Sequence, residues 1–70
     1  MTAYLVIYEQ AEGGGWSAHT PDLPGCYAAA DTKDEVEQLM REAIPFHVDG
    51  MREAGQSIPE PTTSVGYIAA

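Results

Sequence analysis

Residues 32–55, TKDEVEQLMREAIPFHVDGMREAG, decide the fold because they predict one long amphipathic helix. Thr32 is a good helix N-cap, and Glu35 three positions later completes a capping box. We expect the helix to run from Lys33 to Ala54, with Gly55 as the stop. Its buried stripe follows spacings of three and four residues: Val36, Leu39, Met40, Ala43, Ile44, His47, Val48 and Met51.

Pro45 lies inside this stretch, where a proline removes a backbone donor and crowds the carbonyl four residues back. Asp49 and Gly50 form a second, weaker break signal. The stripe nevertheless keeps its phase across Pro45, and two short helices would bury less apolar surface. We therefore expect one kinked helix, and a break at Pro45 is the alternative.

Four further runs have the β-branched and aromatic composition of strands. Three of them precede the helix: Ala3–Glu9, Trp16–Thr20 and Cys26–Ala30. The fourth, Thr62–Ala69, follows the stiff connection Ile58–Pro61 and would close the sheet. The order β-β-β-α-β predicts a single α+β domain over residues 1–70, with one long helix packed on a small, mostly antiparallel sheet.

Both faces of the first predicted strand are apolar. Tyr4, Val6 and Tyr8 form one face, and Leu5 and Ile7 form the other. Such strands are usually covered on both sides, and a chain of this length buries only about 60% of its surface on folding. We therefore expect a homo-oligomer, a dimer or larger, with Tyr4, Val6 and Tyr8 at the contact.

The segment Pro21–Gly25, PDLPG, cannot continue a strand because its two prolines fix φ and lack a backbone N–H. We expect a rigid loop that exposes Leu23. Aromatic and loop-borne apolar residues concentrate at recognition sites, although in a small domain they can also cap the core. The sequence thus predicts a protein-binding surface composed of Trp16, Pro21, Asp22, Leu23, Pro24 and Tyr27.

Acidic residues outnumber basic ones by eleven to three, and the net charge is −8. Phosphate binding needs several basic side chains on one face, which Lys33, Arg41 and Arg52 are too few to supply. We therefore expect no direct nucleic-acid binding. A basic protein partner would be attracted, and the alternative is that the acidic residues only keep the chain soluble.

Cys26 is the only cysteine, so an intramolecular disulfide is excluded and a reducing compartment is indicated. The first residues carry no basic segment of the signal-peptide type, and no apolar run reaches the length of a membrane span. We expect a cytoplasmic protein without membrane contact.

Candidate catalytic groups are few and have simpler explanations. His19, Asp22 and Cys26 lie close in sequence and could suggest a nucleophile with its base. Because of strand alternation and the intervening prolines, their side chains would converge only by accident. His47 lacks a second metal ligand one helical turn away. The acidic residues near the start of the helix are explained by capping and the helix dipole rather than by a two-metal site. We expect no enzyme, no metal and no cofactor.

An ordered set of short segments resembles the HicB family of antitoxins. The set covers about residues 4–61 and consists of Pro21–Cys26, Asp31–Thr32 with Glu35, Glu42–Ile44, Gly55 and Ile58–Pro61. The resemblance implies a partial ribonuclease-H-like fold of order β-β-β-α-β, which agrees with the order read from the strand and helix patterns.

The resemblance also implies a type II toxin–antitoxin role. In such a role the domain binds a small basic HicA-like toxin, which degrades messenger RNA, and the bound domain covers the toxin's active site. Family members commonly carry a C-terminal DNA-binding segment, and none follows in this sequence, which ends at Ala70. A solitary homo-oligomeric regulatory or scaffold domain without a cognate toxin is the main alternative. A metal-dependent nuclease using Asp22 or Asp31 is a weaker one.

Overall fold

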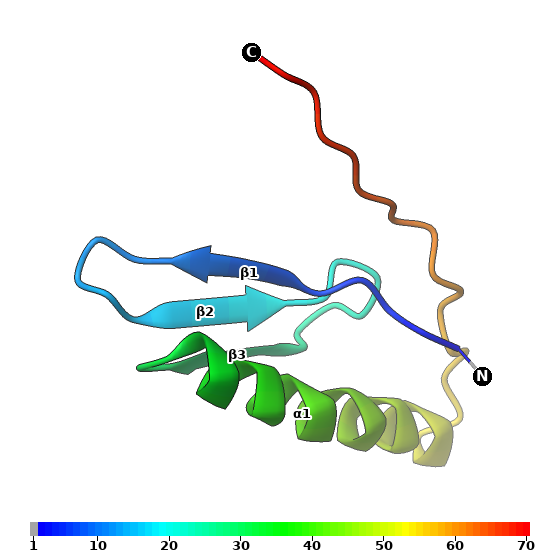
Figure 1. Ribbon diagram of the computed structural model, residues 1–70. Coiled ribbons are helices and arrows are strands. Elements are labelled where there is room, and N and C mark those ends of the chain that lie inside the picture. Colours follow the sequence, from blue (N-terminus) through cyan, green and yellow to red (C-terminus); the bar gives the residue numbers. More distant parts are fainter. Residues whose placement is uncertain (1) are drawn as a thin grey trace.

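The computed structural model describes residues 2–70. Three strands are followed by one helix: β1 (Ile7–Gln10), β2 (Trp16–His19), β3 (Tyr27–Ala30) and α1 (Lys33–Glu53). The strands form an antiparallel sheet in the order β1-β2-β3, and α1 lies along one of its faces (Figure 1). The predicted α+β architecture is confirmed for these four elements, with boundaries of β2, β3 and α1 within one residue of expectation.

Helix α1 begins and ends at the predicted signals. The Glu35 backbone N–H donates to the Thr32 hydroxyl over 3.2 Å, and that hydroxyl donates to the Glu35 carboxylate over 2.8 Å. At the other end Gly55 has φ of +74°, and the next backbone N–H, at Gln56, donates to the carbonyl of Met51. The helix is continuous through Pro45, so a break there is wrong.

Strand register determines which side chains face the helix. Tyr8, Ala18 and Ala28 are register partners across the sheet and share the face that packs on α1. Small residues on β2 and β3 let the helix lie close to the sheet. The buried core formed between them consists of Ala18, Leu23, Cys26, Val36 and Met40.

The loop between β2 and β3 contributes to this core, which corrects the prediction that Leu23 is exposed. Leu23 is fully buried. Three backbone hydrogen bonds close the loop: Thr20 N–H to the Cys26 carbonyl, Leu23 N–H to the Thr20 carbonyl, and Cys26 N–H to the Leu23 carbonyl, over 3.1–3.3 Å. Since these bonds satisfy the backbone, the loop can turn its leucine inward.

The N-terminal and C-terminal predictions also need correction. β1 begins at Ile7 rather than Ala3, and the expected fourth strand over Thr62–Ala69 is not seen: within residues 2–70, no strand follows α1. Residues 62–70 are all exposed and run away from the sheet (Figure 1). The start of this segment is held beside the β2–β3 loop, where Asp22 accepts hydrogen bonds from Thr62 and Thr63.

Candidate protein-binding surfaces

The six residues predicted to bind a partner do not form one surface. Trp16 pairs with Ala30 on the helix-packed face, whereas Tyr27 pairs with His19 on the opposite face of the sheet. Leu23 lies in the core between sheet and helix. Only Pro21, Pro24 and Tyr27 of the predicted set are well exposed. Alternation along short strands thus separates aromatic residues that are close in sequence.

Trp16 is half-buried and takes part in packing at the start of the helix. The Lys33 ammonium lies 5.8 Å from the Trp16 ring centroid and 5.5 Å from the Tyr8 ring centroid. This geometry allows cation–π attraction to both rings. Trp16 therefore joins β1, β2 and α1 and is a poor candidate for a free anchor.

Asp22 binds the segment that follows the helix. Its Oδ1 accepts hydrogen bonds from the hydroxyls of Thr62 and Thr63, over 3.1 and 3.0 Å, and its Oδ2 accepts the Thr63 backbone N–H over 3.2 Å. Desolvation by itself raises the pKa of Asp22, but the hydrogen bonds from Thr63 and Thr62 together outweigh it, and the pKa lies below its ordinary value of 3.8. Asp22 thus serves an intramolecular contact.

The helix-free face of the sheet keeps one predicted anchor. Ile7, His19 and Tyr27 lie in register across the three strands of this face. Tyr27 is 75% exposed. Tyr27 is thus an exposed aromatic residue on the face of the sheet that α1 does not cover.

The outer side of α1 carries a surface that the sequence analysis missed. Phe46 is 82% exposed, and Leu39 is also exposed although it was assigned to the buried stripe. Both recur at helical spacing among carboxylates, and we call this surface the acidic helix face: Glu35, Leu39, Glu42, Phe46, Asp49 and Glu53. The available signal was that Phe46 is out of phase with Val36 and Met40, the buried residues of the helix, and in phase with Glu42 and Glu53.

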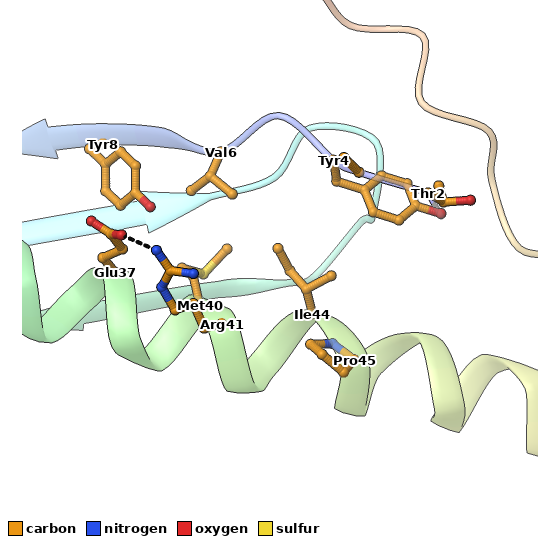
Figure 2. A pocket seen from close by; sticks show the side chains of 10 residues that line it. Thr2, Tyr4, Val6, Tyr8, Glu37, Met40, Arg41, Ile44 and Pro45 are labelled. Atoms are coloured by element: carbon orange, nitrogen blue, oxygen red, sulfur yellow. Dashed lines mark hydrogen bonds and ion pairs between the residues drawn. The ribbon is translucent and has the colours of Figure 1, made fainter.

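A groove separates the chain around β1 from the helix. It has a volume of about 510 Å³. Figure 2 shows apolar side chains facing it from both sides, and these residues define the β1–α1 groove: Tyr4, Val6, Tyr8, Met40, Ile44 and Pro45. The predicted oligomer contact of Tyr4, Val6 and Tyr8 is therefore half-buried and directed toward α1.

Neither metal nor thiol chemistry finds support in the part of the chain that the structure describes. Within residues 2–70, no three histidine, cysteine or acidic side chains are grouped so that they could hold a metal ion. Burial raises the pKa of the Cys26 thiol, which disfavours the reactive thiolate. The one helix in that range is not apolar enough to cross a membrane.

Known proteins are similar to this chain over most of its length. It is 39% identical over 65 residues to a 14.9 kDa protein from the rep-hol intergenic region of Haemophilus phage HP1, covering 93% of this chain and 48% of the relative. A UPF0150 protein of Synechocystis is 33% identical, with 81% of this chain and 72% of the relative covered. A UPF0150 protein of Thermoplasma acidophilum is 32% identical, with 80% and 81% covered.

The chain spans about half the length of the phage relative, whereas the two UPF0150 proteins are matched over most of theirs. A family model described as the HicB-like antitoxin of bacterial toxin–antitoxin systems matches residues 4–70. This match confirms the resemblance and extends it past residue 61 into the segment after the helix. The chain therefore belongs to the HicB-like antitoxin family.

Proposed function

We propose that this domain neutralises a small basic toxin of the HicA type by binding it and covering its active site. Membership of an antitoxin family implies a cognate toxin as partner, and such families are generally non-catalytic. The observation that supports a specific contact surface is the exposed Phe46 in the middle of the acidic helix face. An apolar centre with a charged rim is the usual anatomy of a protein interface.

The charge of this surface suits the proposed partner. A toxin that cleaves messenger RNA must approach phosphates with lysine or arginine side chains. On the acidic helix face Glu35, Glu42 and Glu53 have no basic ion-pair partner in the described chain, whereas Asp49 pairs with Arg52 over 3.3 Å. Free carboxylates would compete with RNA for the toxin's basic side chains and would speed the encounter through long-range attraction.

The helix also gives the surface rigidity. α1 is anchored to the sheet through Val36 and Met40, which are buried on its inner side. Phe46 therefore reaches the partner from a fixed backbone, so little ordering entropy is lost when it binds. Binding by the acidic helix face leaves the β1–α1 groove free.

Co-expression with a small basic toxin of the HicA type tests the proposal. The wild-type domain should relieve toxin-dependent growth arrest and co-purify with the toxin, and binding should weaken as salt is added. Phe46→Ala should weaken binding by about 30-fold, the loss typical of a central aromatic anchor, with little effect on stability because the ring is exposed.

Tyr27→Ala is the matched control, since it removes an exposed aromatic ring from the opposite side of the sheet. It should leave toxin binding within about twofold of wild type, as expected for a residue outside the interface. A loss with Tyr27→Ala and none with Phe46→Ala would place the contact on the helix-free face. Failure of the folded domain to bind or neutralise the toxin would overturn the proposed function and favour the solitary homo-oligomeric domain.

A further inference from the structure

The β3 edge of the sheet has no partner strand within residues 2–70. β3 pairs with β2 on one side only. Its sequence, YAAA, contains neither a charged side chain nor a proline, the residues that usually block a free strand edge. Residues 62–70 are exposed and run away from the sheet (Figure 1), so they do not cover this edge. The β3 edge is therefore open to an added strand.

The hydrogen bond that closes the β2–β3 loop shows which backbone groups of β3 face outward. The Thr20 N–H donates to the Cys26 carbonyl over 3.3 Å, so these two residues form a hydrogen-bonded pair. Bonded and non-bonded pairs alternate along an antiparallel ladder. The register then leaves Tyr27 and Ala29 without ladder bonds to β2, and the bond that closes the turn between β1 and β2 gives the same alternation. The N–H and C=O groups of Tyr27 and Ala29 thus point away from the sheet.

The flank of α1 on the β3 side carries acidic and apolar side chains in turn. We call four members of the acidic helix face, which follow one another at spacings of three and four residues, the β3-side row: Glu35, Leu39, Glu42 and Phe46. The opposite flank of α1 faces the β1–α1 groove through Arg41 and Ile44 (Figure 2). Leu39 is 41% exposed because no strand within residues 2–70 continues the sheet past β3 to cover it.

All three basic residues of the chain lie away from the β3-side row. Arg41 pairs with Glu37 and lines the β1–α1 groove, and Arg52 lines a second pocket near Tyr4. Lys33 lies over aromatic rings of β1 and β2. A basic segment therefore complements the charge beside the β3 edge, whereas a second copy of this chain would bring a row of like charge against it.

We propose that the toxin adds an extended segment to the β3 edge, with its backbone bonded to Tyr27 and Ala29 and its side chains along the β3-side row. This mode of binding rests on the proposed toxin-neutralising function and specifies the segment that the toxin contributes. Side chains on one side of a strand recur about every 6.8 Å, and neighbours in the helical row lie about 5–6 Å apart. The matching segment therefore alternates basic side chains, opposite the glutamates, with apolar ones opposite Leu39 and Phe46.

The Tyr27 side chain stays outside this contact. Its ring lies on the helix-free face, while the toxin segment uses its backbone N–H and C=O groups. Truncation of the ring removes none of these hydrogen bonds, so Tyr27→Ala remains a control for the acidic helix face.

Amide hydrogen exchange of the domain, alone and in complex with a small basic toxin of the HicA type, tests the mode of binding. In the free domain the Tyr27 and Ala29 amides should exchange faster than the amide of Ala28, which is bonded to β2. The toxin should slow exchange at Tyr27 and Ala29 by about 10-fold or more, since both N–H groups become ladder donors.

Two substitutions at one position test the same hydrogen bonds. Ala29→Pro removes an outward N–H, and proline is tolerated in an edge strand where that group faces solvent. It should weaken toxin binding by about 10-fold or more, because the partner carbonyl is left unpaired. Ala29→Ser keeps the N–H and is the matched control, which should bind within about twofold of wild type. Circular dichroism checks that both variants fold, and the exchange experiment on the wild-type chain decides the matter if Ala29→Pro does not.

The outcomes separate this mode of binding from the proposed function. Toxin that is bound and neutralised without slower exchange at Tyr27 and Ala29 would overturn strand addition and leave the proposed function standing. A folded domain that does not bind toxin at all would overturn both. Slow exchange at these two amides in the free, dilute domain would show that the chain itself occupies the edge, and slowing only at high domain concentration would assign the edge to a second copy. Either result would also overturn the proposal.

Discussion

The loop between β2 and β3 and the segment after α1 are similar in composition, but one contributes to the core and the other is exposed. Each combines prolines with apolar side chains. The loop has Pro21, Leu23 and Pro24, and in the segment after α1 Pro59 and Pro61 precede residues 62–70, the C-terminal arm, which includes Val65. The loop places its leucine in the core, whereas the arm stays outside. Apolar composition therefore does not by itself decide whether a proline-containing segment is buried.

Backbone hydrogen bonding explains the difference. The loop closes on itself through hydrogen bonds donated by the N–H groups of Thr20, Leu23 and Cys26. Burial of the loop therefore leaves few of its backbone groups unsatisfied. The arm has no such closure and is tied only at its base, through Asp22. Its remaining N–H and C=O groups stay in water, since residues 64–70 are exposed.

The largest expected effect is a difference in the free energy of unfolding between two truncations to alanine, one in each segment. Leu23→Ala should lower the free energy of unfolding by about 3 kcal/mol, through lost burial and the cavity left behind. Val65→Ala should change it by less than about 0.5 kcal/mol, since the side chain is exposed. Urea unfolding of dilute, monomeric protein measures both. Equal losses would mean that the arm is packed on its own domain.

A smaller effect is expected at two glycines, one in each segment. Gly25 has φ of +83°, and Gly25→Ala should destabilise the fold by about 1 kcal/mol through backbone strain. A Cβ there would lie 3.9 Å from His47 Cε1, which is an ordinary contact, so no steric clash adds to the loss of stability. Gly66→Ala meets open space at a residue without positive φ and should change stability little. The difference in thermal midpoint between the variants checks this, and equal midpoints would contradict it.

The smallest effect concerns the link between the segments. The folded-state pKa of Asp22 lies below 3.8, so the Asp22–Thr63 contact is fully present above that value and is lost as pH falls through the lowered pKa. The amide resonance of Thr63 should titrate with a midpoint below 3.8. Asp22→Asn should abolish that titration. A midpoint above 3.8 in the wild-type chain would show that the carboxylate does not accept these bonds in solution.

Local patterns in the sequence were sufficient for much of the architecture. The capping box at Thr32 and Glu35, the spacing of the buried helix residues and the stop at Gly55 predicted α1 almost to its ends. The three strands before it followed from alternation and turn residues, and the segments around Pro21–Cys26 identified the family. These features repeat over a few residues, because backbone geometry sets the helical and strand periods directly.

The candidate binding surfaces were harder to predict. Trp16 and Tyr27 were grouped because they are close in sequence, yet strand register places them on opposite faces. Phe46 does not follow from the apolar spacing, because that spacing indicates the buried side of α1, whereas Phe46 lies on the outer side among carboxylates. Exposure depends on which face of an element is covered, and that follows only once the elements are packed.

The sequence by itself determined the helix, the order of the first three strands, the acidic charge and the family. Only the tertiary structure decided that Leu23 is buried, that Phe46 is exposed and that the C-terminal arm makes no strand on its own sheet. The physical reason is the range of the interactions involved. Helix and strand periods arise between neighbours, whereas the Tyr4–Pro59 and Asp22–Thr63 hydrogen bonds join residues 55 and 41 positions apart, and no local pattern specifies such pairs.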